Sequence, residues 1–382
     1  MKNKLPRQVV ILSLVSLFTD VASEMLYPVT PIFLTTVLGT SMAAVGIIEG
    51  LAEVTAGLLK GYFGFLSDKI GKRSIFVMIG YGLSAISKPL PGLLPHFSTV
   101  LFSRISDRIG KGIRTAPRDA LLASYAEGNT GTVFGFHRGM DTLGAAIGPI
   151  LSLVLLGIYP ENYTLIFLIA FIPSVIAMGF TFLVKDKQFI PKSKDKGRYS
   201  TFWQSSPSEY KRLIVLLTIF SLVNSSDVFL ILKSRDISQS STLAIAGYIF
   251  YNLVYAAFSY PAGILSDKFG KKKIFVSGLL IFSLVYFGFG ISQNVILMWV
   301  LFALYGIYAS ATEGIAKAWV SDLIPNEYRS SAIGLLTMLS GFAVMLGSVV
   351  TGFLWDQFGS AVPFYISSAV SFIICLILMK SK

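Results

Sequence analysis

The chain has 382 residues, of which 54% are hydrophobic and 14% are charged, and its mean hydropathy is +0.70. This composition excludes an ordinary soluble domain and is typical of a protein with many membrane-spanning helices. The net charge of +12 at pH 7 does not indicate nucleic-acid binding, because the excess bases lie in short loops between apolar runs and not on one soluble surface.

The N-terminus has bases before an apolar run, as a signal peptide does. Lys2, Lys4 and Arg7 precede an apolar stretch that continues to Leu38 without a small-residue cleavage site. We therefore expect an uncleaved first membrane helix. The chain has a single cysteine, Cys375, so it cannot form an intrachain disulfide.

Apolar runs of membrane-spanning length follow one another along the whole chain. A transmembrane helix needs about 20 predominantly apolar residues. The sequence therefore predicts an all-α membrane protein with 12 transmembrane helices. The runs lie at roughly 8–37, 42–66, 74–94, 97–117, 133–159, 163–184, 213–232, 244–265, 274–291, 295–317, 332–354 and 361–379.

Most bases outside these runs lie on the same side of the predicted membrane as the N-terminus. The opposite side has little beyond Lys233 and Arg235. The positive-inside rule therefore places both termini in the cytoplasm and the protein in the inner or plasma membrane. The bases on the N-terminal side are Lys69, Lys72, Arg73, Arg118, the cluster from Lys185 to Arg212, Lys268 to Lys273, Arg329, Lys380 and Lys382.

A repeated turn indicates that the chain is a duplication. The segment 64–73 reads GFLSDKIGKR, and a near copy, GILSDKFGKK, begins 199 positions later, so that Asp267 corresponds to Asp68. The same offset aligns TVFGF at 132–136 with SAIGL at 331–335. Parallel repeats of six helices are a transporter arrangement. We expect two pseudo-symmetric six-helix bundles, 1–184 and 213–382, joined by a cytoplasmic linker over 185–212.

Polar residues recur on one face of the first predicted helix. Asp20, Glu24 and Tyr27 lie at three- and four-residue steps, which places them on the same side of a helix. Charged groups inside a membrane usually face a cavity or one another. A carboxylate in a partly apolar site has a raised pKa and exchanges protons near neutral pH. Asp20 and Glu24 are therefore candidates for proton coupling or cation binding, unless they only pair with neighbouring bases.

Further polar groups lie within other apolar runs. Glu49 and Glu53 share a stripe of the second helix, where transport and structural pairing are both open interpretations. Asn224 and Asp227 lie in the seventh helix, the repeat partner of the first, and are predicted to face the cavity. In the tenth helix, Glu313 and Lys317 are four residues apart and suit an internal ion pair with a structural or gating role. The aromatic residues of the eighth helix are interpreted as packing residues and not as a substrate cage; they are Tyr248, Tyr251, Tyr255 and Phe258.

The fourth predicted helix has an unusual face of charges. Its charged residues fall within about 140° of arc at 100° per residue, whereas its repeat partner is nearly neutral. Two readings stay open, because the bases either neutralise the acids of the first two helices or present free positive charge to an anionic substrate. The face consists of Arg104, Asp107, Arg108, Lys111, Arg114 and Arg118.

The fifth helix and the repeated turns supply candidate crossings and gates. Gly135, Gly144, Gly148 and Pro149 allow a close helix crossing. Asp68 can accept hydrogen bonds from the free N–H groups of a helix start, which makes the first turn a candidate latch. The second turn is expected to be mainly a topology signal, because Pro261 and Ala262 change its approach. The predicted cytoplasmic gate consists of Gly64, Asp68, Lys69, Gly71, Lys72, Arg73, Arg118, Arg138, Asp141, Asp267 and Gly270.

These motifs resemble those of the major facilitator superfamily along the whole chain. The repeated turn resembles motif A, RISDRIGKG at 104–112 resembles motif B, and the glycines of the fifth helix with Pro149 resemble motif C. Motif C is typical of exporters, but its terminal glycines are Ser152 and Leu153 here. The resemblance implies a secondary transporter of the proton-coupled exporter or antiporter branch.

The leading hypothesis is therefore proton-coupled efflux of small organic molecules by alternating access. Alternatives are a carrier of an organic anion that uses the bases of the fourth helix, and a lipid flippase or non-transporting sensor. The sequence contains no phosphate-binding loop and no spaced His/Cys set, so we expect no enzyme, cofactor or metal. The expected partners are a small-molecule substrate, protons and the lipid bilayer, but no nucleic acid, and the protein is expected to function as a monomer.

Overall fold

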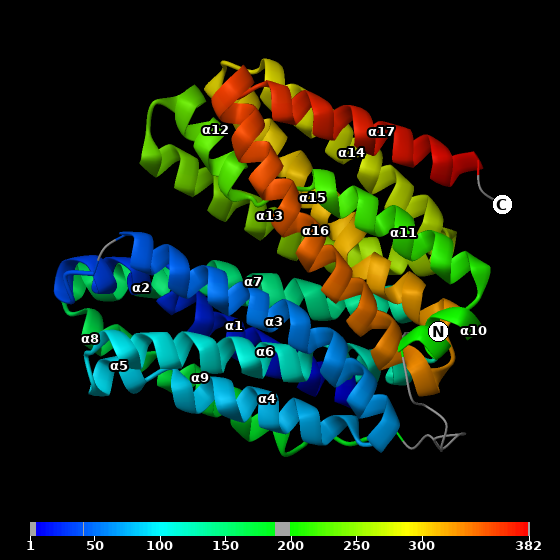
Figure 1. The fold of residues 1–382 in the computed structure, drawn as a ribbon, viewed down its shortest axis with the longest axis horizontal. Coiled ribbons are helices and arrows are strands. Elements are labelled where there is room, and N and C mark those ends of the chain that lie inside the picture. Colours follow the sequence, from blue (N-terminus) through cyan, green and yellow to red (C-terminus); the bar gives the residue numbers. More distant parts are fainter. Residues whose placement is uncertain (1–4, 41, 188–198, 381–382) are drawn as a thin grey trace. The chain divides into compact units, whose positions relative to one another are not determined.

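A computed structural model describes residues 5–40, 42–187 and 199–380, and these residues form helices without any strand (Figure 1). All twelve predicted runs are helical, which confirms the all-α membrane fold. Eight described helices or helix pairs are long and apolar enough to cross a membrane. The first six runs contain α1 (Arg7–Leu26), α2 (Val29–Ile32), the π-helical turn η1 (Phe33–Val37), α3 (Met42–Ile70), α4 (Arg73–Ser87), α5 (Leu90–Leu93), α6 (Phe97–Tyr125), α7 (Thr130–Ile158), α8 (Tyr163–Ile169) and α9 (Phe171–Thr181).

The second six runs follow a short helix, α10 (Tyr199–Ser205). Several of these helices extend beyond the predicted apolar runs through charged and polar residues, and the run 213–232 is interrupted between Val223 and Val228. They contain α11 (Ser208–Val223), α12 (Val228–Ser238), α13 (Ser241–Phe269), α14 (Lys271–Ile291), α15 (Val295–Leu323), the 3-10 turn η2 (Asn326–Tyr328), α16 (Arg329–Phe358) and α17 (Val362–Lys380).

The chain groups into two compact units. Unit 1 contains residues 1–127, 140–202 and 325–338, and unit 2 contains residues 128–139, 203–324 and 339–382. The start of α7 therefore belongs to unit 2, and the start of α16 belongs to unit 1. The expected bundles 1–184 and 213–382 with a linker over 185–212 stay a prediction.

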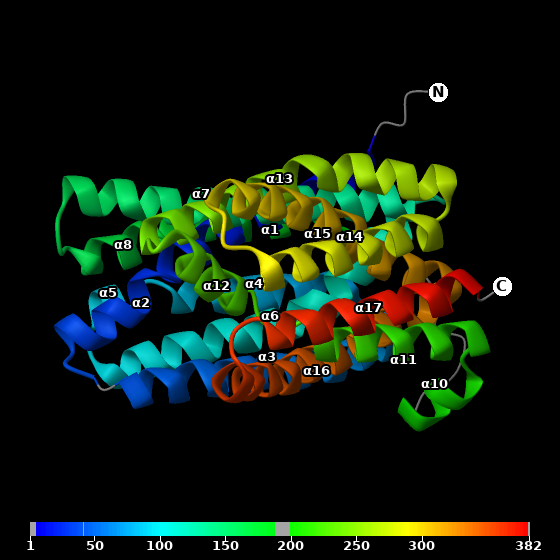
Figure 2. The ribbon, with the colours of Figure 1, turned by 90° about the horizontal axis from the view of Figure 1, so that it is seen from above.

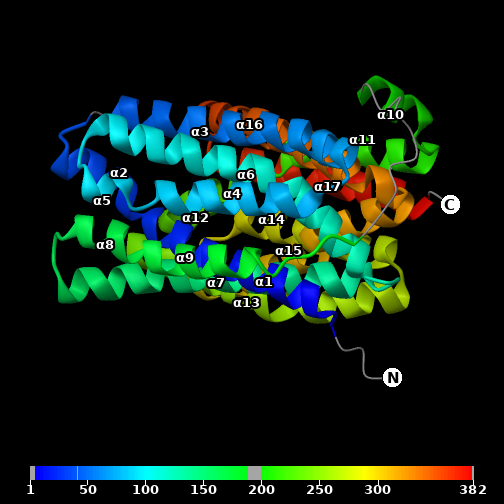
Figure 3. The ribbon, with the colours of Figure 1, turned by 90° about the horizontal axis from the view of Figure 1, so that it is seen from below.

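Unit 1 is held together by close helix crossings and an apolar cluster. In it α6 lies beside α3 and α4 (Figure 3). A Cβ atom added at Gly80 of α4 would lie 2.6 Å from the carbonyl oxygen of Gly110 in α6, so the absence of side chains allows these helices to approach closely. Near the other end of the unit, the buried rings of Phe33 and Phe167 pack edge to face at 5.2 Å.

Unit 2 packs α13 and α14 against α15, and α17 against α14 (Figure 2). Its interior is rich in aromatic residues, including the stacked rings of Phe282 and Tyr286 at 3.9 Å. Ser283 and Ser368 hydrogen-bond each other's backbone carbonyls, at 2.9 and 2.7 Å, between α14 and α17. These bonds satisfy the serine hydroxyls and the backbone carbonyls, because no water is available to them in an apolar environment.

The first helix of each repeat is interrupted at an equivalent position. The helix from Arg7 ends at Leu26 and resumes at Val29, and the helix from Ser208 ends at Val223 and resumes at Val228. The offset of 199 places Leu26 against Ser225, inside the second interruption. Discontinuous helices expose backbone polar groups and commonly form binding sites in transporters.

Candidate functional site

The motif C-like glycines bring α7 against the acidic face of α1 within unit 1. A Cβ atom at Gly144 would lie 3.2 Å from the Cβ of Asp20, and one at Gly148 would lie 2.8 Å from the Cβ of Glu24. Ser152, where motif C has a glycine, donates a hydrogen bond of 2.6 Å to the carbonyl oxygen of Met25. The crossing therefore holds both acids directly against α7.

The partner of Asp20 is Asp141 of α7, which the sequence interpretation assigned to the gate. The two carboxyl groups lie close enough to act on each other. Two adjacent carboxylates repel each other, and a shared proton relieves this repulsion. Asp141 also accepts a hydrogen bond from Ser16 of α1.

The acids of α1 connect to α6 by two routes. Arg118 donates to Ser16 (3.0 Å) and forms an ion pair with the fully buried Asp119 (2.9 Å). Glu24 experiences the positive charges of three bases of α6, which are Lys111, Arg108 and Arg104 in order of decreasing influence. Lys111 also acts on Asp20. These bases therefore lie near the acids of α1.

The other charged residues of α6 lie against α4. Asp107 forms a buried ion pair with Lys88, with 2.8 Å between Nζ and Oδ1, and Arg114 donates to Ser84 and lies over the ring of Tyr81 at 4.3 Å. Removing one partner of such a buried pair leaves an uncompensated charge. The single charged face expected for this helix thus divides into a structural side and a side near α1.

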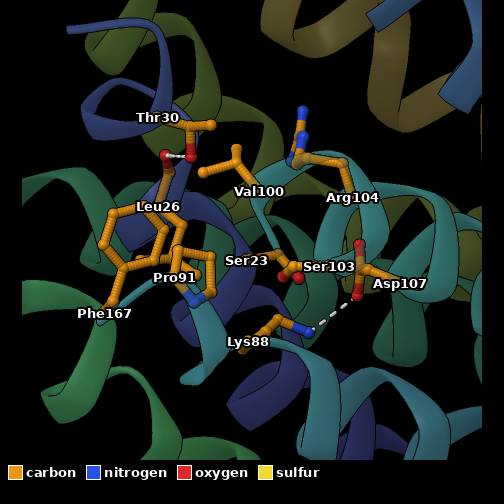
Figure 4. Close-up of a pocket in the computed structure, with 10 residues that line it drawn as sticks. All are labelled: Ser23, Leu26, Thr30, Lys88, Pro91, Val100, Ser103, Arg104, Asp107 and Phe167. Atoms are coloured by element: carbon orange, nitrogen blue, oxygen red, sulfur yellow. Dashed lines mark hydrogen bonds and ion pairs between the residues drawn. The ribbon is translucent and has the colours of Figure 1, made fainter. Parts of the chain in front are cut away.

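A small cavity of unit 1 lies beside the Lys88–Asp107 pair (Figure 4). It has space of about 20 Å³ for water centres, enough for roughly one water molecule. In Figure 4 the guanidinium of Arg104 points away from the ion pair, and Ser23 and Ser103 lie between them. The cavity is lined by Ser23, Leu26, Thr30, Lys88, Pro91, Val100, Ser103, Arg104, Asp107 and Phe167.

In unit 2 the interruption between α11 and α12 holds Asn224 and Asp227. The Asp227 carboxylate accepts hydrogen bonds from Tyr305 (2.7 Å) of α15 and Tyr251 (3.3 Å) of α13. The rings of these tyrosines lie 4.9 Å apart. Tyr251 therefore packs against other aromatic rings and also contacts an embedded carboxylate through its hydroxyl.

A second polar pair of unit 2 joins the start of α7 to α15. Arg138 forms an ion pair with Glu313 and donates to the hydroxyl of Tyr255. This ion pair of Glu313 reaches across helices, and the pairing of Glu313 with Lys317 stays a prediction. Lys317 is half-buried on α15.

The first turn copy contacts the start of α16 inside unit 1. Asp68 accepts hydrogen bonds from the backbone N–H (2.7 Å) and hydroxyl (2.9 Å) of Ser331 and forms a buried ion pair with Arg73 (2.7 Å). A Cβ atom at Gly64 would lie 2.6 Å from the carbonyl oxygen of Ser330. Lys69 and Lys72 are exposed.

The second turn copy makes the matching contacts inside unit 2. Asp267 accepts hydrogen bonds from the N–H groups of Gly131 (2.9 Å) and Thr132 (2.6 Å) at the start of α7. The offset of 199 relates these residues to Ser330 and Ser331. Lys271 pairs with Asp267 (3.0 Å) and Asp322 (2.7 Å). The second copy is therefore more than a topology signal, although Pro261 and Ala262 precede it.

Both turn copies depend on a glycine with positive φ, a conformation that other residues adopt only with strain. Gly71 has φ of 76° and Gly270 has φ of 97°. Among the other predicted residues, Gly135 of α7 packs against Ser259 of α13 in unit 2, and Pro149 lies inside α7. Tyr27 follows α1 and is 53% exposed.

Two of the predicted acids have side chains that the structure does not describe, and several residues of the site were not predicted. Glu49 and Glu53 lie on α3, but their side chains are outside the described part of the structure. Sequence reasoning missed Lys88, Asp119, Asp186 and Asp322. Asp186 accepts hydrogen bonds from the N–H groups of Arg73 (2.9 Å) and Ser74 (3.0 Å) at the start of α4. The sequence signal for Asp186 was an acid directly after the sixth apolar run, but we assigned this residue to the linker.

Twelve helical runs, a repeated turn and embedded ionisable side chains together define a multi-pass secondary transporter. A family model described as Major Facilitator Superfamily matches residues 12–249 and 213–381. The chain is 36% identical over 386 residues to the uncharacterized MFS-type transporter MJ1317 of Methanocaldococcus jannaschii, covering 99% of this chain and 95% of that protein. The chain therefore belongs to the major facilitator superfamily.

More distant similarities agree with this fold. Over 129 residues, 34% of this chain and 31% of the relative, the sequence is 31% identical to multidrug resistance protein 2 of Bacillus subtilis. The structure matches the human organic anion transporter MFSD10 with a TM-score of 0.81 at 16% identity, covering 98% of this chain and 100% of that chain. It also matches the Escherichia coli fucose:proton symporter FucP with a TM-score of 0.79 at 13% identity, covering 98% of each chain.

Proposed function

We propose that this protein exports small organic molecules in exchange for protons by alternating access. The observation that carries this proposal is the close approach of the carboxyl groups of Asp20 and Asp141, because two adjacent carboxylates repel each other unless one of them holds a proton. The nearby Lys111 of α6 favours the charged carboxylate and hence proton release, whereas the negative charge of Glu24 favours a bound proton. Proton coupling therefore resides in unit 1.

The two turn copies serve as gates in this proposal. Asp68 and Asp267 each bind the free N–H groups at the start of a helix, where the helix dipole favours negative charge. Breaking and remaking these bonds allows the helix starts to move during transport. In this scheme the protein works as a monomer in the plasma membrane with both termini in the cytoplasm.

Transport in proteoliposomes with an imposed pH gradient tests the proposal. The cargo panel is rhodamine 6G, fluorescein and a fluorescent phospholipid, which represent a cation, an anion and a lipid. We expect flux of at least one soluble dye that depends on the gradient and loses this dependence in Asp20→Asn with Glu24→Gln. Flux that ignores the gradient, or full activity of the double variant, would contradict proton coupling.

The panel also separates the alternative functions. Gradient-independent flux of fluorescein that is lost in Arg104→Ala would favour an organic-anion carrier. Movement of the labelled phospholipid without movement of either dye would favour a flippase. Binding of a dye without any flux would favour a sensor.

A further inference from the structure

Asp227 is an embedded carboxylate on which the charge of Arg138 acts without a direct ion pair among the described residues. In the described part of the chain no lysine or arginine forms an ion pair with it, and both of its side-chain hydrogen bonds come from the neutral phenols of Tyr251 and Tyr305. The acids Asp68 and Asp107 instead contact Arg73 and Lys88 directly. An unneutralised carboxylate inside a membrane protein is expensive, so Asp227 favours a state in which a positive charge lies beside it.

The interruption that holds Asp227 also presents a second acceptor. The backbone of Asn224 leaves the helical conformation, with φ of −90° and ψ of 76°. Its Oδ1 atom is buried and has no hydrogen-bond partner among the described residues. A buried polar atom without a partner is costly, and an amide oxygen and a carboxylate in one four-residue interruption both attract a donor or a cation.

Aromatic rings surround this carboxylate. Tyr251 and Tyr305 lie 4.9 Å apart, Tyr248 lies 5.5 Å from Tyr251, and Tyr305 lies 5.2 Å from Tyr308. Ring faces attract organic cations through the quadrupole of the ring. The phenol hydroxyls of Tyr251 and Tyr305 also hold the carboxylate in place.

We propose that the Asn224–Asp227 interruption, with the rings of Tyr251 and Tyr305, binds the positively charged group of an organic cation that the protein transports. This inference rests on the proposed transport function and names its substrate class. The carboxylate neutralises the charge, the rings contact the apolar part of the cation, and the free Oδ1 of Asn224 accepts a hydrogen bond where the cation carries an N–H group.

A metal ion fits this site less well than an organic cation. Hard cations such as Ca²⁺ take six to eight oxygen ligands, and the side chains of the interruption offer fewer, namely one carboxylate, the amide oxygen of Asn224 and the hydroxyls of Ser225 and Ser226. The described residues contain no group of three or more His, Cys, Asp or Glu side chains that could hold a metal. The tyrosine hydroxyls already donate to the carboxylate, which leaves their rings as the surface for an organic ligand.

Equilibrium dialysis of the full-length protein in detergent, without any gradient, tests the site. Rhodamine 6G and fluorescein share a xanthene ring system but carry opposite charges. We expect rhodamine 6G to bind the protein and Asp227→Asn to weaken this binding about tenfold or more, with fluorescein unaffected. Asp236→Asn removes an exposed acid of the same helix α12 and should leave rhodamine 6G binding unchanged.

Two further substitutions separate binding from folding. Asn224→Asp adds negative charge to the interruption and should tighten rhodamine 6G binding, which a merely damaged protein would not do. Tyr251→Phe keeps the ring and should retain most of the affinity, whereas Tyr251→Leu should lose it. Each variant is compared with the wild type by size-exclusion elution and thermal unfolding.

The outcomes distinguish this inference from the proposed function. The inference would be overturned if a normally folded Asp227→Asn variant bound rhodamine 6G as tightly as the wild type. This holds even if the variant no longer moved protons in liposomes. Asp227-dependent binding combined with flux that ignores the pH gradient would support the cation site and overturn proton coupling alone.

Discussion

Embedded acids of this transporter differ in what neutralises them. Asp68, Asp107 and Asp119 each contact a base at 2.9 Å or less, which suits a structural role. Asp20 contacts another carboxyl group, and Asp227 contacts phenols. Because their charge is not cancelled by a direct base, the second group of acids can exchange a proton or a cation without breaking the fold.

The Asp20–Asp141 pair leads to a prediction for Asp141→Asn. The amide cannot take or release a proton, so gradient-driven dye accumulation in proteoliposomes should fall to the passive leak, while dye binding in detergent stays near that of the wild type. A pH-sensitive dye inside the liposomes measures the accompanying proton movement. Glu127→Gln, an exposed acid between α6 and α7, is the control, and unchanged accumulation in Asp141→Asn would remove this pair from the coupling mechanism.

At the scale of single elements, glycines decide how closely two helices approach. Gly144 and Gly148 bring α7 onto α1 at the two acids, and Gly80 and Gly110 bring α4 onto α6. Close crossings of this kind depend on small residues, because lipid offers no hydrophobic drive for helices to associate. The motif C-like glycines thus position Asp20 and Glu24 against α7 and do not themselves carry charge.

A methyl group at Gly148 should disturb this crossing. In Gly148→Ala the new Cβ would lie 2.7 Å from the carbonyl oxygen of Val21, and we expect a loss of about 1–3 kcal/mol of stability, typical of overpacking. Thermal unfolding in detergent measures the effect. Gly157→Ala on the same helix, where nothing lies within 4 Å of the new atom, should unfold as the wild type does, and equal midpoints of both variants would refute the close crossing.

The two turn copies should differ in how much stability is lost when their aspartate is replaced by asparagine. Asp68→Asn breaks the ion pair with the fully buried Arg73, and breaking a buried pair costs about 3–5 kcal/mol. Asp267→Asn leaves Lys271 paired with Asp322 and should cost less. Unfolding midpoints and dye flux of both variants test this order, with the exposed Asp356→Asn as a control, and an equal or larger loss in Asp267→Asn would contradict it.

At the scale of the whole molecule, the duplication repeats a scaffold and varies its chemistry. The turns, their glycines, the contacted helix starts and the interrupted first helices recur at one offset. The charged residues of α6 have no counterpart in α15 beyond Glu313 and Lys317, and the aromatic site around Asp227 replaces the acids of α1. One repeat therefore supplies proton chemistry and the other supplies a cation site in our proposal.

The proposed orientation of the chain is testable with single cysteines. In a Cys375→Ser background, Ser193→Cys in the predicted linker should react with a membrane-impermeant maleimide only after the cytoplasmic side is opened. Gln293→Cys, in the exposed turn between α14 and α15, should react in intact cells. The reverse labelling pattern would invert the topology that the positive-inside rule predicts.

The sequence by itself determined the helical runs, the duplication and the faces that carry polar residues, because hydropathy and helical period are local properties of the chain. Only the tertiary structure decided which groups meet. Lys88 and Asp107 are 19 residues apart, and Arg138 and Glu313 are 175 apart, so no local pattern links them. Asp20 meets Asp141 because the glycine crossing places α7 against α1. Asp227 meets its phenols because a helix interruption places it beside α13 and α15. Both placements depend on packing between helices.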